Sequence, residues 1–453
     1  MKRVHFIAVG GSVMHNMAIA LHKKGYRVTG SDDEIFEPSR SRLAKYDLLP
    51  EKAGWDPDNV DDNLDAVILG MHAREDNPEL IKAKEAGVRI YSFPEYIYEQ
   101  SRDKVRVVIG GSHGKTTITS MIMHVLDKNK KEFDYMVGAQ LEGFETMVKL
   151  TENAPCIILE GDEYLSSPID RRPKFHLYHP HIALISGIAW DHINVFPTWD
   201  EYLQQFRTFV DLIENNGSLI WYEGDAELKK NVENCKAGIK KYAYSTHEYV
   251  VKNNNTFLVS DDRHIPLCIF GRHNLQNISG AKIVCNELGI NDKQFYDAIS
   301  SFRGAAKRLQ LLKENQYTSV YLDFAHAPSK LKATTKAVKE QYPDRKLVAC
   351  MELHTFSSLK EEFLPHYKGA MKTADEAYVY FNPDVIRHKK LKEITPAQVK
   401  EAFGGDNLTI FTDSALLIDK LLSSDWKNKN LLLMSSGNFS GIDFNELAEK
   451  IID

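Results

Sequence analysis

Short runs of apolar residues alternate along the chain with stretches in which apolar residues recur every three or four positions. The first pattern predicts buried β-strands and the second predicts amphipathic helices. In the first hundred residues we expect strands over residues 4–9, 27–30, 66–70 and 88–92, and helices over residues 14–24 and 77–86. Strands that alternate with helices are typical of a parallel, doubly wound sheet, so this segment predicts a Rossmann-like domain.

The same alternation continues through two further segments. In the second we expect strands over 105–109, 156–160 and 181–188, a loop and helix over 110–127, helices over 199–214 and 275–288, and a β-rich region over 242–270. In the third we expect strands over 319–323, 347–351, 376–380 and 431–434. The predicted class is α/β, with a Rossmann-like domain at 1–103, a P-loop ATPase-like parallel-sheet domain at 104–313 and a second Rossmann-like domain at 314–453. The charged stretch 99–104 is predicted to be the first linker.

Composition narrows the class of protein. The 453 residues are 43% hydrophobic and 26% charged, with a net charge of -6 at pH 7. This mildly acidic balance argues against nucleic acid or an anionic membrane as the main partner. Five scattered cysteines form no C-x-x-C pair, so neither a disulfide framework nor a structural zinc site is expected. No stretch reaches the roughly 18 apolar residues of a membrane helix, and the run 4–9 is too short for a secretory signal. We therefore expect a cytoplasmic protein.

The sharpest chemical signal is a glycine-rich loop between a predicted strand and a predicted helix. It reads Gly110-Gly111-Ser112-His113-Gly114-Lys115-Thr116-Thr117. The backbone N–H groups of such a loop converge with the helix N-terminus on one point and favour an anion there. Lys115 adds a positive charge for the β- and γ-phosphates, and Thr116 offers a hydroxyl to Mg²⁺. The loop is one residue shorter than the standard phosphate loop, yet its strand–loop–helix context predicts a nucleotide triphosphate site.

Two later strands of the same segment are followed by possible metal ligands. Glu160 ends the strand 156–160, and carboxylates at the carboxyl end of a parallel strand lie beside the phosphate loop of such a fold. Because Mg²⁺ prefers oxygen ligands, Glu160 is a predicted metal ligand. Asp191 and His192 follow the strand 181–188, and the sequence alone fits a structural pair as well as a catalytic one.

Two motifs near the end of the second segment carry weaker signals. His273 and Asn274 precede a helical pattern, and Asn274 can cap that helix or hydrogen-bond the edge of a base. Arg308 lies at the join to the third segment. Its forked guanidinium suits a transferring phosphate, although an ordinary surface arginine is an equally simple interpretation.

The first segment carries a nucleotide-binding pattern of its own. A glycine turn, Gly10-Gly11-Ser12, follows its first strand, and Asp32 ends its second strand about twenty residues later. In a doubly wound fold this spacing holds a pyrophosphate and a ribose. A nicotinamide cofactor and a UDP-sugar both carry these groups, but the complete G-x-G-x-x-G of nicotinamide sites is missing.

Together these motifs resemble the Mur ligases, ATP-dependent enzymes that add amino acids or peptides to muramic acid. The resemblance covers essentially the whole chain and rests on Gly111–Thr117, Glu160-Gly-Asp-Glu163, Asp191-His192, Gly271-Arg-His-Asn274, Lys307-Arg308 and Asp323-Phe-Ala-His326. It implies that Lys115 contacts the γ-phosphate in an ATP site lined by Gly111, Ser112, His113, Gly114, Thr116 and Thr117. It also implies two Mg²⁺ ions organised by Thr116, Glu160 and His192, adenine held by His273 and Asn274, and an ATP site completed by Arg308, Asp323 and His326.

The same resemblance implies a UDP-N-acetylmuramate site in the first domain. Gly10, Gly11, Ser12 and Asp32 would bind it, and His72, Arg74 and Asn77 match the family's second nucleotide-contacting loop. Lys115, Glu160, His192 and Arg308 are then the expected catalytic residues of a ligase that forms an acyl phosphate. The expected partners are small-molecule substrates only, and the chain is expected to be a monomer or a homodimer.

Two branches of the family use this acceptor: one adds L-alanine in new synthesis, and the other adds the tripeptide L-alanyl-γ-D-glutamyl-meso-diaminopimelate in peptidoglycan recycling. Segments resembling the tripeptide branch are Asp162-Glu-Tyr164, the run 170–175, Tyr178-His-Pro180 and the ending 433–442. Glu352-Leu-His-Thr-Phe356 is closer to the alanine branch, and Gly161 and Ala327 depart from the usual residues. We expect tripeptide ligation, with L-alanine ligation as the alternative and His354, Thr355, Ser357 and Asn438 as candidate peptide contacts.

Two rival interpretations remain at this point. A non-catalytic nucleotide-binding switch would use the phosphate loop but leave Asp32 and the glycine turn without a role. A folylpolyglutamate-type ligase would share the central domain but would carry no UDP site in its first domain.

Overall fold

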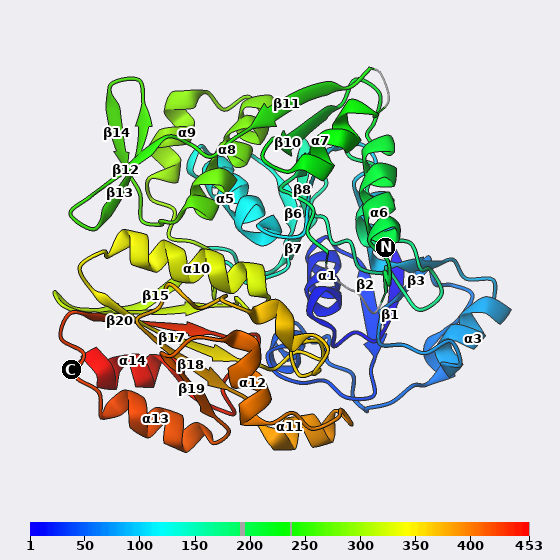
Figure 1. Cartoon of the computed structure of the whole chain (residues 1–453). Helices are drawn as coiled ribbons and strands as arrows, with labels where there is room; N and C mark the ends of the chain where they lie inside the picture. The colour runs from blue at the N-terminus through cyan, green and yellow to red at the C-terminus, as the bar shows by residue number, and fades with distance from the viewer. Residues whose placement is uncertain (191–194, 236–237, 453) are drawn as a thin grey trace. The chain divides into compact units, whose positions relative to one another are not determined.

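The first sheet of the protein consists of four parallel strands in the order β2-β1-β3-β4 (Figure 1). The structure is a computed structural model that describes residues 1–190, 195–235 and 238–452. The strands are β1 (Arg3–Ile7), β2 (Arg27–Ser31), β3 (Ala66–Leu69) and β4 (Ile90–Ser92). The helices around them are α1 (Ser12–Lys23), α2 (Ser39–Ala44), the 3₁₀ helix η1 (Pro57–Asn59), α3 (Pro78–Glu85) and α4 (Phe93–Gln100).

The second sheet has the order β11-β10-β9-β5-β8-β6-β7 and is parallel except for the short last pair. Its strands are β5 (Val105–Gly110), β6 (Asp134–Met136), β7 (Val148–Lys149), β8 (Cys156–Glu160), β9 (Ile182–Ile185), β10 (Ser218–Tyr222) and β11 (Lys240–Tyr244). The helices of this region are α5 (Lys115–Lys128), η2 (Lys174–Leu177), α6 (Trp199–Asp211), α7 (Ala226–Glu233), α8 (Arg272–Glu287) and α9 (Asp292–Ile299). The central strands β5, β8 and β9 are almost entirely buried, which explains their continuous apolar sequences.

One hydrophobic core joins these two sheets. It includes Val4 and Phe6 from β1 as well as Val108 from β5, whereas Val67 and Leu69 of β3 point to a separate core on the other face of the first sheet. Polar contacts join the same regions: the Met147 N–H donates to the Asn16 side chain at 3.0 Å. Residues 1–245 and 276–299 accordingly form one compact unit.

The second compact unit comprises residues 246–275 and 300–453. Its main sheet has the order β15-β16-β20-β17-β18-β19, parallel except for β15. The strands are β15 (Gln310–Glu314), β16 (Ser319–Asp323), β17 (Lys346–Glu352), β18 (Glu376–Tyr380), β19 (Leu408–Phe411) and β20 (Lys429–Met434). A small antiparallel sheet contains β12 (Tyr249–Lys252), β13 (Asn255–Ser260) and β14 (Arg263–Pro266). The helices are α10 (Pro328–Gln341), η3 (Leu364–Tyr367), α11 (Pro383–His388), α12 (Pro396–Phe403), α13 (Ser414–Leu422) and α14 (Phe444–Ile452).

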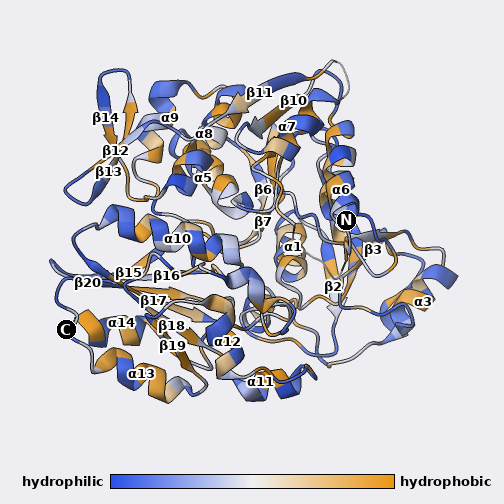
Figure 2. Cartoon of the chain, in the orientation of Figure 1, coloured by the Kyte–Doolittle hydropathy of each residue, from blue (hydrophilic) through white to orange (hydrophobic). Residues whose placement is uncertain are grey.

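The main sheet of this unit is covered on both faces. Alternate residues of β17 enter different cores: Ala349 and Met351 pack with residues of α10 and α12, whereas Val348 and Cys350 pack with residues of α13 and α14. Figure 1 shows α10 on one side of the sheet and α13 and α14 on the other. Hydropathy follows the same arrangement, since the strands are largely apolar and the helices carry polar outer surfaces (Figure 2).

The structure confirms the predicted α/β class and most strands, and it corrects several details. Residues 99–104, predicted as a linker, are the end of α4 and a turn in which Ser101 and Lys104 are buried and Lys104 donates to Asp134 at 2.6 Å. The two compact units comprise residues 1–245 with 276–299 and residues 246–275 with 300–453, and the predicted domain boundaries at 103 and 313 remain predictions. Among the helices that the structure describes, none combines the length and apolarity needed to cross a membrane.

Candidate active site

The glycine-rich loop connects β5 to α5, as its sequence predicted. Two of its glycines have positive φ angles, +118° at Gly111 and +82° at Gly114, a conformation that favours glycine. A Cβ atom on Gly111 would also lie 2.9 Å from the Ser186 backbone nitrogen. Gly114 is the N-cap of α5, so the unpaired N–H groups of the first helical turn face the loop and create a site for an anion.

Lys115 opens α5 and is held inside the loop. Its Nζ donates to the Gly111 carbonyl at 2.8 Å and to Glu163 Oε2 at 2.5 Å. Burial alone would lower the pKa of Lys115, but the negative charge of Glu163, with those of Asp162 and Glu160, raises it above its ordinary value. The lysine is therefore charged at neutral pH and can pair with a phosphate.

Glu163 is fully buried and joins Lys115 to a hydrogen-bond network. The Tyr202 hydroxyl from α6 donates to Glu163 Oε1 at 3.2 Å and lies 2.8 Å from the Ser112 hydroxyl. Ser112 Oγ accepts from the Ala189 N–H at 2.8 Å. The network fixes the loop to the segment that follows β9. Sequence analysis did not assign roles to Glu163 and Tyr202, and only the position of Glu163 within the acidic motif could have suggested one.

Thr116 and Glu160, two of the three predicted metal ligands, lie side by side. The Thr116 hydroxyl donates to Glu160 Oε1 at 2.7 Å, and the Gly138 N–H donates to Glu160 Oε2 at 2.7 Å. A Cβ on Gly138 would lie 2.9 Å from that same oxygen, so only glycine allows this approach. Hydroxyl and carboxylate oxygens are suitable ligands for Mg²⁺ beside a phosphate loop. The third predicted ligand, His192, and its neighbour Asp191 lie outside the described residues.

Residues of the run 170–175 contact the acidic segment Glu160–Glu163 and pair with one of its carboxylates. Lys174 Nζ donates to Asp162 Oδ2 at 2.5 Å, and the Phe175 N–H donates to the Asp162 carbonyl at 3.1 Å. Arg172 pairs with Asp170 at 2.6 Å and with Glu95 of α4 at 3.2 Å. Each carboxylate of the segment therefore has its own partner: Glu160 has Thr116, Asp162 has Lys174, and Glu163 has Lys115. The remaining predicted residues of the loop, His113 and Thr117, lie at its tip and in the first turn of α5.

The other predicted ATP-site residues belong to the second compact unit and are described within it. Asn274 does not cap α8, because the helix begins at Arg272; the Asn274 side chain instead donates to the Phe270 carbonyl at 2.8 Å. Burial lowers the pKa of His273, and the charge of Asp323 opposes that shift. Asp323 ends β16 and accepts from the Thr334 hydroxyl at 2.6 Å and from the Leu309 N–H at 3.2 Å.

Arg308 and His326 flank Asp323 in the same unit. The Arg308 guanidinium lies 4.8 Å from the centre of the Phe324 ring, and the residues on either side of it, Lys307 and Leu309, have positive φ angles of 56° and 45°. Such angles are strained for non-glycine residues and often occur at functional segments. The His326 carbonyl accepts from the Tyr367 hydroxyl at 2.6 Å.

The residues predicted to bind the UDP-sugar form two groups in the first sheet. Asp32 Oδ2 accepts from the Gly10 N–H at 2.7 Å, which joins the aspartate to the turn that contains Gly11 and the exposed Ser12. Burial raises the pKa of Asp32 to about 6, although the Gly10 hydrogen bond opposes this. Asn77 caps α3 by accepting from the N–H groups of Glu79 and Leu80, both at 3.0 Å. His72 and Arg74 are exposed on the loop before it, and no hydrogen bond between the two groups occurs among the described residues.

These features define a class of protein. A phosphate loop with a charged lysine, beside a threonine and a glutamate that suit Mg²⁺, is a nucleoside triphosphate site of a doubly wound fold. Three family models match the chain: the Mur ligase family catalytic domain over residues 3–104, the Mur ligase middle domain over 109–285 and the Mur ligase glutamate ligase domain over 307–437.

Individual relatives agree with these matches. The chain is 30% identical to a UDP-N-acetylmuramate–L-alanine ligase of a Sulfurihydrogenibium species over 372 residues, 80% of this chain and 79% of the relative. It is 24% identical to the UDP-N-acetylmuramate–L-alanyl-γ-D-glutamyl-meso-2,6-diaminoheptandioate ligase of Haemophilus influenzae, over 100% of this chain and 99% of the relative. The chain belongs to the Mur ligase family, and it is an ATP-dependent ligase that forms amide bonds.

Solved structures show the same three-domain fold. A UDP-N-acetylmuramate–alanine ligase from Thermotoga maritima has a TM-score of 0.69 and 20% identity, and covers 100% of this chain and 98% of its own. A murein peptide ligase from Psychrobacter arcticus has a TM-score of 0.65 and 20% identity with the same coverage. The fold is therefore common to both branches and does not separate them.

Proposed function

We propose that the protein joins the lactyl carboxylate of UDP-N-acetylmuramate to the amine of L-alanyl-γ-D-glutamyl-meso-diaminopimelate, as in peptidoglycan recycling. The observation that supports ligase chemistry most directly is the half-buried, charged Lys115 at the phosphate loop, next to the Thr116–Glu160 pair. The proposed domains are a UDP-sugar domain at 1–103, an ATP domain at 104–313 and a C-terminal domain at 314–453.

In the proposed reaction the substrate carboxylate attacks the γ-phosphate of ATP to give an acyl phosphate and ADP. The peptide amine then displaces phosphate. Lys115 would exchange its contact with Glu163 for the γ-phosphate and, with Arg308, would stabilise the charge that develops on the phosphoryl oxygens. Thr116 and Glu160, together with His192, would hold Mg²⁺, which supplies Lewis-acid stabilisation of the phosphates when bound.

The choice between the two branches rests on sequence segments in both compact units. The run 170–175 and the ending 433–442 resemble the tripeptide branch, and they lie in different units. L-alanine ligation is the alternative, supported by the segment 352–356 and by the alanine-ligase relative at 30% identity.

The deciding measurement is kcat/KM for L-alanine, L-alanyl-γ-D-glutamate and the tripeptide, each with UDP-N-acetylmuramate and ATP. We expect the tripeptide to be the best amine, with the loss for L-alanine in kcat as well as KM, because binding of the distal residues contributes to the transition state. Equal or better use of L-alanine would assign the chain to the biosynthetic branch. Absence of UDP-N-acetylmuramate binding in calorimetry would instead favour a folylpolyglutamate-type ligase or a nucleotide switch.

Activity should be indifferent to bicarbonate. Several Mur ligases bind their second Mg²⁺ through a carbamylated lysine shortly after the Asp-His motif, but this chain has no lysine between His192 and Lys229. Arg207 lies near the expected position, is exposed, and donates to Asn231 at 3.2 Å. Rates in carbon-dioxide-depleted buffer with and without added bicarbonate should agree, and a clear rescue by bicarbonate would contradict the proposed metal ligands.

UDP-N-acetylmuramate binding should weaken as pH falls through about 6, because the buried Asp32 has its pKa raised to about 6 and would accept a ribose hydroxyl only as a carboxylate. Asp32→Asn should bind this ligand about tenfold or more weakly at pH 8 and lose the pH dependence. Calorimetry at pH 5.5 and 8 tests both points. The ligand is suitable because its pyrophosphate, esterified at both ends, keeps its charge over this range.

The same substitution should stabilise the free protein at pH 8. A carboxyl group whose folded pKa is raised contributes stability at low pH and loses it as pH rises through the folded value. Removing the charge of Asp32 therefore removes a cost that is present above about pH 6. A thermal melt of Asp32→Asn that shows no gain at pH 8, with unchanged ligand affinity, would contradict the assigned role.

A further inference from the structure

The carboxyl ends of β17 and β20 mark a topological switch point of the second compact unit, the position at which doubly wound folds have their ligand crevice. These neighbouring strands are parallel, and β17 ends at Glu352 while β20 leads into Ser435. The chain leaves β17 toward the face that packs Leu364 of η3, and it leaves β20 toward the opposite face, which packs Leu447 of α14. Adjacent strands whose connections leave on opposite faces separate at their carboxyl ends, and ligands bind there in doubly wound folds.

Glu352 places a buried negative charge at this switch point. Its side chain is 3% exposed, and one oxygen, Oε2, accepts from both the Phe439 N–H at 2.9 Å and the Ser435 hydroxyl. The other oxygen, Oε1, lies 3.5 Å from His354 Nδ1. Within the described part of the chain, neither a lysine nor an arginine forms an ion pair with it. A buried carboxylate without a full cationic partner is costly, so a function for it is expected.

The loop after β20 is built against this carboxylate. A Cβ on Gly437 would lie 2.8 Å from Glu352 Oε2 and 2.9 Å from His354 Nδ1, so a larger residue there would require these side chains to shift. The hydroxyl of Ser436, next in the loop, is buried and has no hydrogen-bond partner among the described residues. A buried hydroxyl of this kind is available to a polar ligand.

Lys389 contributes a positive charge near Glu352 without pairing with it. It follows α11, donates from Nζ to the His354 carbonyl at 2.7 Å and lies 4.6 Å from the centre of the Phe356 ring. Burial lowers the pKa of Lys389, and the negative charge of Glu352 opposes that shift. No carboxylate lies within ion-pair distance of Lys389 in the residues that the structure covers, so two of its N–H donors remain for a ligand.

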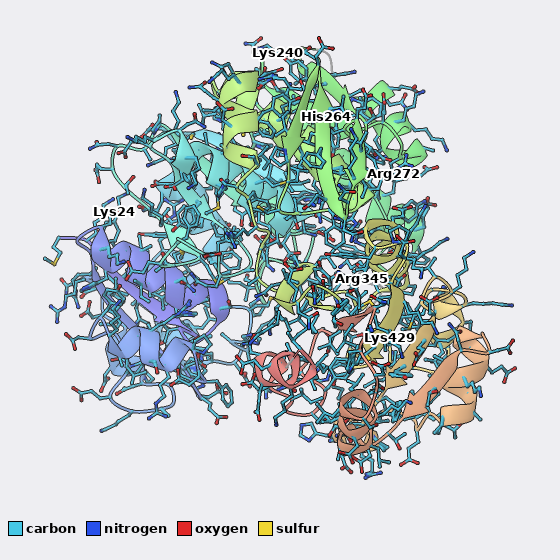
Figure 3. The ribbon with its side chains drawn as sticks, turned by 90° about the vertical axis from the view of Figure 1, so that its left-hand side faces the viewer. Lys24, Lys240, His264, Arg272, Arg345 and Lys429 are labelled. Atoms are coloured by element: carbon cyan, nitrogen blue, oxygen red, sulfur yellow. The ribbon has the colours of Figure 1, made fainter. Side chains whose placement is uncertain are left out.

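The opposite edge of the sheet provides a comparison. Arg345 and Lys429, labelled in Figure 3, lie at the amino ends of β17 and β20. Lys429 pairs with Glu376 at 3.0 Å, and Arg345 donates to the Ser319 hydroxyl and to Asn430, both at 3.1 Å. At the amino edge Lys429 thus has a carboxylate partner and Arg345 donates to neutral oxygens. At the carboxyl edge, among the described residues, Glu352 has only His354 within ion-pair distance and Lys389 has no carboxylate within that distance.

We propose that Glu352 and Lys389 bind the far end of the diaminopimelate residue, with Glu352 receiving its ammonium and Lys389 its carboxylate. This inference rests on the proposed tripeptide ligase function. The far end of diaminopimelate is a zwitterion that the reaction does not consume, so it keeps both charges from binding to product release. L-alanine has no such second zwitterion, because its only amine is the nucleophile.

The test compares two tripeptides that differ in the charges at the far end of the third residue with a dipeptide that lacks that residue altogether. The diaminopimelate tripeptide carries the distal ammonium and carboxylate, L-alanyl-γ-D-glutamyl-L-lysine carries the ammonium alone, and L-alanyl-γ-D-glutamate carries neither. Lys389→Met should lower kcat/KM for the first by about tenfold or more and leave the other two unchanged. Glu352→Gln should lower kcat/KM for both tripeptides by a similar factor and leave the dipeptide unchanged.

The variants are chosen to keep the fold. Both donors to Glu352 share Oε2, so the carbonyl oxygen of glutamine can accept both while the amide replaces the free oxygen. Lys390→Met, at the exposed neighbouring position, is the matched control and should behave as wild type with all three amines. The KM values for ATP and UDP-N-acetylmuramate should be unchanged in every variant, and thermal melts should agree with wild type.

Each outcome is decisive. If Glu352→Gln and Lys389→Met lower activity equally with all three amines, or with none, these residues do not recognise the distal zwitterion and the inference is wrong. If the wild-type protein uses L-alanine and not the tripeptide, the proposed function fails, and this inference fails with it. That second result is visible before any variant is made, so the two failures are distinguishable.

Discussion

Lys115→Ala should lower kcat/KM by a factor of hundreds, on the order of 3 kcal/mol or more of transition-state stabilisation. The reason is that Lys115 supplies the only full positive charge contributed by residues 110–117, and its raised pKa keeps it charged at neutral pH. The measurement is steady-state kinetics with ATP varied. Near-normal turnover by a folded Lys115→Ala protein would contradict the assignment of residues 110–117 as the phosphate-binding loop.

The contact with Glu163 adds a stability effect that sequence reasoning did not anticipate. Glu163 is buried, so removing Lys115 leaves its carboxylate with the Tyr202 hydroxyl and without a cation from the loop. We expect Lys115→Ala to lower the melting temperature, since removing one partner of a buried ion pair is destabilising by about 3–5 kcal/mol. The double variant Lys115→Ala with Glu163→Gln should regain stability but not activity. A double variant that regains both would assign Lys115 a structural role only.

Glu160→Gln should reduce kcat by at least about a hundredfold at ordinary Mg²⁺ concentrations and raise the Mg²⁺ concentration needed for half-maximal rate. The glutamate has one oxygen on the Thr116 hydroxyl and the other on the Gly138 N–H, and a glutamine amide can accept only one of these bonds. It also loses the charge that attracts the metal. The measurement is a Mg²⁺ titration at saturating ATP.

Glu152→Gln is the matched control for this experiment. It removes one carboxylate from an exposed loop just before β8 and should leave the Mg²⁺ titration unchanged. If Glu160→Gln and Glu152→Gln give the same titration curve, Glu160 does not hold the metal. A loss of kcat without any change in Mg²⁺ dependence would indicate a role in ordering the loop through Thr116.

The local chemistry of the phosphate loop was predictable because it depends on consecutive residues. The order of strand, glycines, lysine and threonine determines the anion site. The position of Glu160 at the end of a buried strand places a possible metal ligand beside that site. The contact between Lys115 and Glu163 was not predictable, since it depends on how β5 and β8 align in the sheet. The start of the helix at Asn274 was misjudged by three residues, because α8 begins at Arg272 and not at residue 275, so the possible cap is a residue of the first turn.

The run 170–175 shows a limit of arguing from sequence segments. Its resemblance to the tripeptide branch supported the predicted amine substrate, yet its Lys174 contacts Asp162 beside the phosphate loop. The contact that the structure shows for this run is therefore with the acidic segment Glu160–Glu163. The surroundings of Glu352 were likewise not predictable from the sequence, because Lys389 is 37 positions away and donates to the His354 carbonyl only in the folded protein.

The shared core of the first compact unit has a consequence for how the chain is made and how it can be divided. Residues 1–103 leave the ribosome first, but one face of their sheet packs into a core that strands of the next segment complete. The Asn16 side chain likewise accepts its hydrogen bond from Met147, which is synthesised later. A fragment cut at residue 103 would expose that apolar face and should aggregate or remain partly unfolded. Chimaeras between the two branches of the family should therefore exchange residues 300–453 and keep residues 1–245 from a single parent.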